Sequence, residues 1–380
     1  MPATTNGKPP VLVVVQLGGG NDFMNTLIPY GSNVYYDSRP KVNIAQEDVL
    51  PMNDMYGWHP MLGPLRDMFD AGDVAVIQGI GYPNPIRSHF RSMDIWHTAE
   101  PDKMITDGWL GRAIRDLDPD KENILTAVNF GRGLPRALAA PGVSVASVGD
   151  LDSYGVLTGI EDKQDRTQAL DIFGRMYSPM IGSGAVNDYL SQTGLDALKG
   201  ADILSTAPKT YSSSVEYGGS PFAQWLKNIA QVHIAGFGTR VLYTGVNPGT
   251  FDTHANENIT MPKLWGDVSN AVSDFYEDLK EHHANEEVVM LMFTEFGRRV
   301  QENGSGTDHG SGSVAFVIGD SVKGGLYGEY PSLEPDKLDQ GDLQWNNDFR
   351  GTYATLLEKW MGVDANPVLG GQFEQFDFIK

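Results

Sequence analysis

The segment from Val11 to Asn25, VLVVVQLGGGNDFMN, constrains the fold more than any other part of the sequence. Its first five residues are apolar and, except for Leu12, β-branched, which is typical of a parallel strand buried on both faces. Three glycines and then Asn21 and Asp22 follow. Because open α/β sheets bind ligands at the carboxyl ends of their strands, the segment predicts a carboxylate at a binding edge. The alternative is a tight turn in which Asp22 caps the next helix.

The glycine run is not a nucleotide-binding loop. The third glycine of the GxGxxG fingerprint is missing, and the sequence contains no GxxxxGK[ST] motif. Both nucleotide-loop interpretations are therefore set aside.

Composition excludes several classes of partner. The formal net charge of −21 disfavours nucleic acids and anionic lipid surfaces as partners. We expect a small-molecule or anionic substrate, although the same net charge repels anions. An anionic substrate would need a metal ion or an arginine cluster that inverts the local field. The absence of cysteine excludes disulfides, thiolate metal sites and a cysteine nucleophile. No apolar run is long enough to span a membrane.

The first ten residues, MPATTNGKPP, contain no signal peptide as written. Two interpretations stay open: an exported protein given without its leader, or a cytoplasmic protein.

Strands and helices alternate along most of the chain. Buried strands are expected at residues 74–80, 240–246, 287–293 and 314–318, and helices at 221–235, 263–283 and 349–361. This alternation predicts an α/β fold with a mostly parallel central sheet and helices on both faces. We expect one domain over residues 11–362 and a C-terminal tail over 363–380. The weakly patterned region 131–219 is interpreted as an inserted cap, with a helical part over 163–198.

Polar residues gather where the expected strands end. They are Asp22, the pair Ser88-His89, the triplet Asp252-Thr253-His254, Glu295, and Asp308-His309 in the loop that enters the last strand. Carboxylates and imidazoles at one sheet edge are suitable ligands for a divalent metal ion. In an extended segment residues two apart point the same way, so Asp252 and His254 can share an ion.

Each of these residues also has a structural interpretation. The DTH triplet could form a turn, Glu295 a surface ion pair, Asp308 a turn cap and Ser88 a helix N-cap. The other histidines lack carboxylate neighbours at suggestive spacing and are interpreted as structural or surface residues; they are His59, His97, His233, His282 and His283.

Six blocks of sequence carry a resemblance to a known family. They are LGGGNDFMNTLIPY, YPNPIRSHFRSMDIW, GTFDTHANEN, LMFTEFGRRVQENGSGTDHGSG, VKGGLYGEYPSL and DFRGTYATLLEKWMG. In this order, from Val11 to Gly362, the chain resembles the bacterial domain-of-unknown-function family 1501. That family is placed in the alkaline phosphatase-like superfamily, which also holds sulfatases and phosphodiesterases. The resemblance implies an alkaline phosphatase-like fold and, because most members use the twin-arginine route, a periplasmic or secreted protein.

The superfamily pattern implies two adjacent metal positions. Asp22 and Glu295, with Ser88 at the place of the nucleophile, resemble the ligands of one ion. Asp252, His254 and His309 resemble the ligands of the other, and Asp308 beside His309 is a further candidate ligand. Two cations could lower the pKa of a serine hydroxyl or a water and neutralise charge on a phosphoryl oxygen.

Other positions concern the substrate. Arg87 and Arg91 are candidates for contacts to substrate oxygens. The Cys/Ser-x-Pro-x-Arg signature of the common sulfatases is not met, because Ser88-His89-Phe90 lacks the proline. A sulfatase of the common type is therefore disfavoured.

The sequence departs from the superfamily pattern at the metal ligands as well. The usual Asp-His pair reads Glu295-Phe296, so one imidazole is missing, and Asp252 and His254 are closer in sequence than the usual pair. The loss of an imidazole favours an oxygen-rich site for Ca, Mg or Mn, or a site that no longer performs hydrolysis. Zn remains a candidate, with one or two ions bound.

We therefore expect a metal-dependent hydrolase of a phosphate ester or related anion. Ser88 or a metal-bound water would be the nucleophile. Two alternatives stay open: a metal-dependent enzyme with different chemistry, including redox chemistry, and a non-catalytic exported binding protein.

Overall fold

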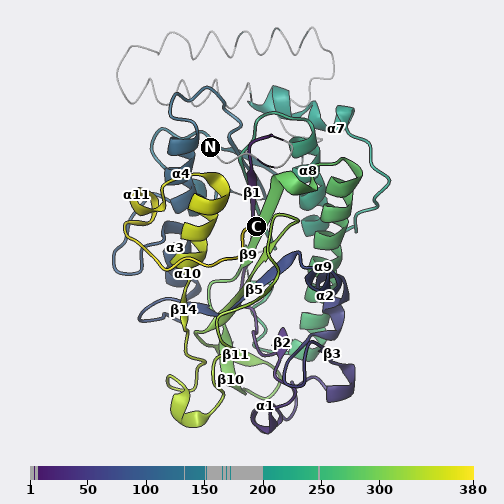
Figure 1. The fold of residues 1–380 in the computed structure, drawn as a ribbon, viewed down its shortest axis with the longest axis vertical. Coiled ribbons are helices and arrows are strands. Elements are labelled where there is room, and N and C mark those ends of the chain that lie inside the picture. The colour runs from purple at the N-terminus through teal and green to yellow at the C-terminus, as the bar shows by residue number, and fades with distance from the viewer. Residues whose placement is uncertain are drawn as a thin grey trace.

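The structure is a computed structural model that describes residues 4, 7–131, 133–149, 151, 165, 168, 172, 200–246 and 249–380 (Figure 1). The strands of its central sheet are β1 (Val11–Leu17), β5 (Val74–Gly81), β6 (Ala127–Phe130), β7 (Ala146–Val148), β8 (Val241–Val246), β9 (Val288–Phe293), β12 (Ser313–Ile318), β13 (Gly325–Tyr327) and β14 (Asn347–Asp348). Their order is β13-β5-β12-β9-β1-β8-β6-β7, and β14 also pairs with β5.

Helices lie on both faces of this sheet (Figure 1). On one face are α2 (Gly63–Asp70), α8 (Pro221–Ile234) and α9 (Glu257–Glu281). On the other are α3 (His89–Thr98), α4 (Trp109–Leu117), α10 (Phe349–Thr355) and α11 (Ala365–Leu369). The smaller elements are α1 (Asn33–Ser38), α7 (Ala207–Thr210), the sheet of β2 (Leu27–Ile28), β4 (Gly57–Trp58) and β3 (Leu50–Pro51), and the pair β10 (Arg298–Glu302) and β11 (Thr307–His309).

The strand β1 is the centre of the sheet, as its sequence predicts. It pairs in parallel with β8 on one side and with β9 on the other. Its side chains alternate between two cores: Val13 and Val15 pack with α2, α8 and α9, while Leu12 and Val14 pack with α3, α4, α10 and α11. Burial on both faces explains the unbroken apolar run. The predicted fold class, a mostly parallel α/β sheet with helices on both faces, is confirmed.

One strand of the central sheet runs against the others and determines where the site forms. β12 is antiparallel to both β5 and β9, whereas every other described pair in this sheet is parallel. Its first residue, Ser313, lies opposite Ile80 near the carboxyl end of β5. The segment that enters β12 therefore lies at the same edge as the segments that leave the parallel strands.

The boundaries of several elements differ from those expected. α9 begins six residues before the expected start at residue 263 and continues through Pro262. The last expected helix is divided, because α10 ends at Thr355 and Leu356–Met361 forms a π-helix. Within region 131–219, β7 is an edge strand of the main sheet, and the helical part expected at 163–198 lies outside the described residues apart from isolated positions. The tail 363–380 contains α11 and buries Phe378.

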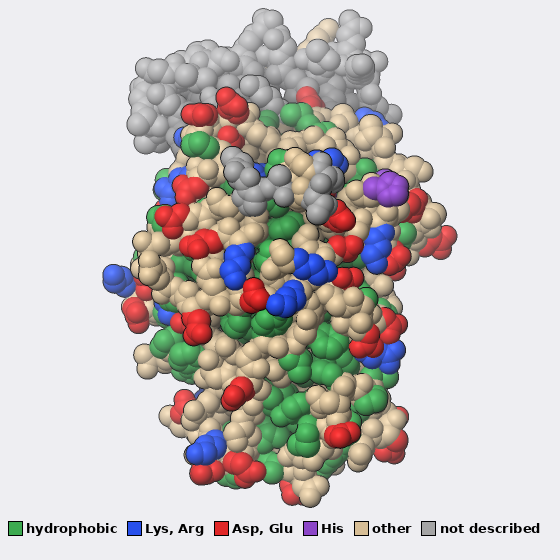
Figure 2. Space-filling model, in the orientation of Figure 1, with side chains coloured by type: hydrophobic (Ala, Val, Ile, Leu, Met, Phe, Trp, Pro, Cys, Tyr) green, Lys and Arg blue, Asp and Glu red, His purple; other side chains and the backbone are tan. Residues whose placement is uncertain are grey.

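Across the described part of the chain, none of the helices combines the length and apolar character that a membrane span requires. On the face shown in Figure 2, basic side chains are interspersed with acidic ones.

Candidate metal centre

Four segments bring the candidate ligands together at the carboxyl edge of the sheet. His89 begins α3 after β5, Asp252 and His254 follow β8, Glu295 follows β9, and His309 ends β11 just before β12. The antiparallel direction of β12 is the reason that His309 joins the residues that follow parallel strands.

The three histidines are oriented in the same way. In each of them the Nδ1 atom lies within hydrogen-bond distance of an oxygen: His89 of Glu295 Oε1 at 2.9 Å, His254 of Asp308 Oδ1 at 3.1 Å, and His309 of the Arg87 carbonyl at 2.8 Å. An oxygen acceptor at Nδ1 places the proton of the neutral ring there, so the lone pair is on Nε2. This is the orientation that carboxylates and carbonyls give to metal-binding histidines.

The Nε2 atoms of these histidines converge on one carboxylate, that of Asp252. His254 and His309 each lie 3.1 Å from its Oδ1, and His89 lies 3.4 Å from its Oδ2. The Nε2 atoms of His254 and His309 are 2.9 Å apart, so two lone pairs face each other and require a proton or a cation between them. Four tetrahedral ligands at 2.0–2.1 Å from a zinc ion are about 3.3 Å from one another.

The donor atoms therefore fit a divalent metal ion. The ligand atoms of His89, Asp252 and His309 all lie within 4.8 Å of one another. His254 offers a further nitrogen, since its Nε2 lies 3.1 Å from Asp252 and 2.9 Å from His309.

Arg298 keeps Asp252 ionised and in place. Its fully buried guanidinium donates to Asp252 Oδ1 at 2.6 Å and to the carbonyls of Gly20 and Phe251. Burial of Asp252 raises its pKa, but the hydrogen bond and positive charge of Arg298, with smaller contributions from His309 and His254, outweigh burial and hold the pKa below its usual range. The loop must pass close to this carboxylate: a Cβ at Gly19 would lie 2.4 Å from the Asp252 backbone nitrogen, and Gly19 also has a φ of +126°. Only glycine fits there.

Glu295 fixes the position of α3 as well as the ring of His89. Its buried carboxylate accepts from the Gly19 backbone N–H at 2.9 Å, and its carbonyl accepts from Ser92 and from the Trp96 indole. The hydrogen bond from His89 to Glu295 raises the pKa of His89. His309 differs, because burial lowers its pKa.

Asp22 lies apart from this cluster. Its carboxylate is buried, pairs with Arg39 at 2.6 Å, and accepts from the backbone N–H groups of Met24 and Asn25. It thus stabilises a turn, and no helix follows directly. Burial raises the pKa of Asp22, but Arg39 and the hydrogen bond with Glu257 together outweigh burial and hold the pKa below its usual value.

The residues around Ser88 also point in different directions. Arg87 pairs with Asp342 at 2.6 Å, and only its carbonyl contacts the histidine cluster. Arg91 donates to Asp94 at 2.8 Å and to the carbonyl of Pro101. The exposed Ser88 occupies the N-cap position of α3, but its side chain makes no capping hydrogen bond.

Several residues of the site were not assigned from the sequence. The sequence places His89 with Ser88 among the polar residues that follow the strands but assigns it to neither metal position, although its place after a buried strand is the same signal that identifies Asp252. Arg298 lies three residues after Glu295, and its role depends on contacts with carbonyls that are distant in sequence. His97 was interpreted as structural or surface. It is buried, which lowers its pKa to about 4, and it also lines a cavity beside the metal centre.

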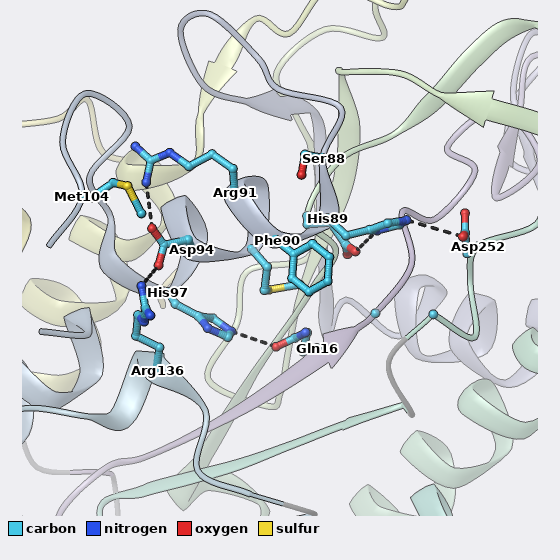
Figure 3. Close-up of a pocket in the computed structure, with 14 residues that line it drawn as sticks. Gln16, Ser88, His89, Phe90, Arg91, Asp94, His97, Met104, Arg136 and Asp252 are labelled. Atoms are coloured by element: carbon cyan, nitrogen blue, oxygen red, sulfur yellow. Dashed lines mark hydrogen bonds and ion pairs between the residues drawn. The ribbon is translucent and has the colours of Figure 1, made fainter. Parts of the chain in front are cut away.

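This cavity has a volume of about 720 Å³ (Figure 3). One end is formed by Ser88, His89, Asp252 and Glu295. Gln16, His97, Asp94 and Arg136 line the rest with the apolar side chains of Phe90, Met93 and Met104. In Figure 3, Phe90 lies between the His89–Asp252 pair and the His97–Gln16 pair.

The fold and the site together define an α/β protein with a candidate divalent metal centre at the carboxyl edge of its sheet. Residues 205–368 match the model of the family described as "Protein of unknown function (DUF1501)". The resemblance to family 1501 is therefore confirmed over these residues. A comparison with curated proteins finds no match to the sequence.

Solved structures of similar fold include three bacterial proteins. The PsFucS1 sulfatase from Pseudoalteromonas sp. is 12% identical, with a TM-score of 0.45 and coverage of 98% of this chain and 71% of that one. A protein in the alkaline phosphatase superfamily from Vibrio parahaemolyticus is 11% identical, with a TM-score of 0.43 and coverage of 98% and 71%. The lipoteichoic acid synthase LtaP from Listeria monocytogenes is 8% identical, with a TM-score of 0.37 and coverage of 91% and 76%. At these identities the similarity concerns the fold alone.

Proposed function

We propose that the protein is a metal-dependent hydrolase of a phosphate ester or a related anionic ester. Its metal ion is held by His89, Asp252, His254 and His309. The observation that carries the proposal is the convergence of three Nε2 atoms on the Asp252 carboxylate, each on a ring whose Nδ1 faces an oxygen.

The donor set favours zinc and a single ion. From the sequence, an oxygen-rich site was expected, because Phe296 stands where the superfamily has a histidine ligand. In the structure His89 contributes an imidazole to the cluster, so nitrogen donors dominate, and such a set suits zinc more than Ca or Mg. Asp22 is held by Arg39, so its carboxylate is not available for a second ion.

A divalent ion at this centre supplies a positive charge that polarises the ester and lowers the pKa of a nucleophile. The chain's own groups orient the reactants. Glu295 holds the Nδ1 side of His89, and Arg298 keeps Asp252 ionised. The backbone N–H groups in the first turn of α3 can bind an anionic oxygen, as at other helix N-termini. Ser88 lies at that N-terminus, where its hydroxyl is free of a capping hydrogen bond.

The experiment that tests this proposal is elemental analysis of the purified protein beside the Asp252→Ala/His309→Ala double variant. We expect about one zinc per chain in the parent protein and none in the variant. His283→Ala is the matched control, since that histidine lies outside the cluster, and it should retain the metal. Iron or copper would instead favour redox chemistry, and no metal after soaking would refute the hydrolase proposal.

A second experiment separates the two nucleophiles, the Ser88 hydroxyl and a water. The Ser88→Ala variant is assayed with p-nitrophenyl esters of phosphate and its metal content is measured. Loss of turnover with the metal retained assigns the nucleophile to Ser88. Unchanged turnover assigns it to water. If neither protein hydrolyses any ester although both bind the metal, a binding protein on this fold replaces the enzyme.

We also propose that the protein acts outside the cytoplasm on a small anionic substrate. The support is the resemblance to a family of exported proteins, and the absence of cysteine is compatible with it. Fractionation of the native host tests the location, and recovery of the protein in the cytoplasmic fraction alone would contradict it.

A further inference from the structure

The cavity beside the metal centre has unusually exposed apolar side chains on its walls. Phe90, in the first turn of α3, is 92% exposed, and Met104, in the loop after α3, is 79% exposed. Met93, one turn of α3 after Phe90, completes this apolar surface. Large apolar groups that line a concave site are typical of ligand pockets, because a bound apolar group removes them from water.

The charges around the cavity suit an anion. Two arginines, Arg91 and Arg136, and three carboxylates, Asp94, Asp252 and Glu295, line it. One of these carboxylates, Asp252, is already paired with the buried Arg298 at 2.6 Å. A divalent ion at the metal centre therefore makes this end of the cavity positive, and it attracts an anionic group.

A single amide supplies a directed hydrogen bond from the cavity floor. Gln16 lies on β1, and its Oε1 accepts from the Tyr243 hydroxyl at 2.6 Å and faces His97 Nε2 at 2.9 Å. These two neighbours fix the amide so that its NH₂ group is the remaining donor. Within the described ranges this NH₂ group donates to no other residue, so it can donate to a ligand oxygen.

We propose that this cavity binds the apolar part of the substrate, and that the substrate is an anionic ester of an aryl or long-chain alkyl alcohol. This inference rests on the proposed function, which places the anionic group at the metal centre. Phe90 and Met104 contact the apolar group, and the amide of Gln16 donates to an oxygen of the ester or of its alcohol. Phosphodiesters and sulfate monoesters share this chemistry.

The test is calorimetric binding of inert anions to the metal-loaded protein. Diphenylphosphinate carries one charge and two rings, whereas dimethylphosphinate carries one charge and no ring. We expect diphenylphosphinate to bind at least about tenfold more tightly than dimethylphosphinate. Equal affinities for the two phosphinates would overturn the proposal.

Variants show whether the named side chains are responsible. Phe90→Ala and Met104→Ala should each weaken diphenylphosphinate binding by about tenfold while dimethylphosphinate binding stays unchanged. Ile259→Ala is the matched control, since Ile259 is 61% exposed on α9 and does not line the cavity, and it should change neither. Because Phe90 is almost fully exposed, its replacement leaves the core intact, which the unfolding temperature checks. Unchanged binding in both test variants would contradict the assignment.

Two further measurements separate this inference from the proposed function. In the metal-free Asp252→Ala/His309→Ala protein, the neutral diphenylmethanol should still bind, and Phe90→Ala should still weaken that binding, even if no ester is hydrolysed. Conversely, hydrolysis that Phe90→Ala does not affect, at any concentration of an aryl substrate, would refute the cavity assignment and leave the hydrolase proposal standing. Rates with bis(p-nitrophenyl) phosphate and p-nitrophenyl sulfate then distinguish the two ester sources.

Discussion

Arg298 supports both the fold and the metal centre, so its replacement should affect two measurable quantities. Its guanidinium is fully buried and donates to Asp252 and to the carbonyls of Gly19, Gly20, Phe251 and Thr307. Arg298→Met keeps most of the side-chain volume but leaves the Asp252 carboxylate and four carbonyls without this partner. We predict that the variant is less stable and also binds the metal more weakly.

The size of the stability loss follows from burial. Removing this guanidinium costs about 3–5 kcal/mol, because buried carbonyls lose their donor and the partly buried Asp252 loses its counter-charge. Unfolding entropy is about 2.1 cal/mol/K per residue, so a loss of about 4 kcal/mol in a chain of 380 residues lowers the unfolding temperature by about 5 °C. Loss of a group that orients a metal ligand should weaken metal binding by about 10–100-fold.

Urea unfolding and competition with a chelating dye measure the two effects. Arg299→Met is the matched control, since Arg299 is the next residue and its half-exposed side chain pairs with Asp342 at 3.4 Å. We expect it to cost about 1 kcal/mol or less and to leave metal affinity unchanged. Equal losses in the two variants, or unchanged metal affinity in Arg298→Met, would refute the role assigned to Arg298.

Three further predictions concern the histidines and the metal. At a free metal concentration of 100 times its Kd, the bound metal should add about 2.7 kcal/mol to the free energy of unfolding, and EDTA should remove this contribution. The free energy of unfolding of His309→Ala should be the same with and without EDTA. Metal affinity should rise as the pH rises through the raised pKa of His89, because His89 must be neutral to bind the metal. In Glu295→Gln, dye competition should show this rise at a lower pH. The same pH dependence in both proteins would contradict the assigned cause. The free energy of unfolding should fall as the pH drops from about 6.5 to about 4, because His97 is protonated at higher pH in the unfolded chain than in the folded protein. Urea unfolding of His97→Gln should show a decrease that is smaller by up to about 3 kcal/mol. The same pH dependence in the parent protein and the variant would exclude this cause.

The pH effects have opposite signs because the two pKa values move in opposite directions. The folded protein holds the His97 pKa below the unfolded value, so it resists protonation and loses stability in acid. In the metal-free protein, the pair of His89 with Glu295 stabilises the fold below about pH 6.5, and this contribution is lost as the pH rises through the raised pKa of His89.

Much of the fold follows from local sequence patterns. The run Val11–Leu17 identifies itself as a central strand because both of its faces are apolar, and β5, β8, β9 and β12 carry comparable signals. A sheet whose strands are mostly parallel brings the residues after them to one edge. Asp252 and Glu295 were therefore recognised as members of a common edge without any coordinates.

The membership of the metal centre was decided only by the tertiary structure. Asp22 and Glu295 have the same sequence signal, an acid after a buried strand, but Arg39 lies 2.6 Å from the Asp22 carboxylate whereas His89 lies 2.9 Å from that of Glu295. Pairing across such separations depends on packing, which local patterns do not encode. A polar residue's neighbours, and not its type, determine whether it binds a metal, a substrate or another side chain.

The chain's sequence by itself thus determined the type of sheet and the edge at which its polar residues meet. The tertiary structure decided that β12 runs antiparallel and that His89 turns toward Asp252. It also decided that Phe90 and Met104 line the same cavity as these two residues. The physical reason is that strand burial is a property of each segment, whereas a ligand set requires several distant segments to place single atoms within a few ångströms of one another.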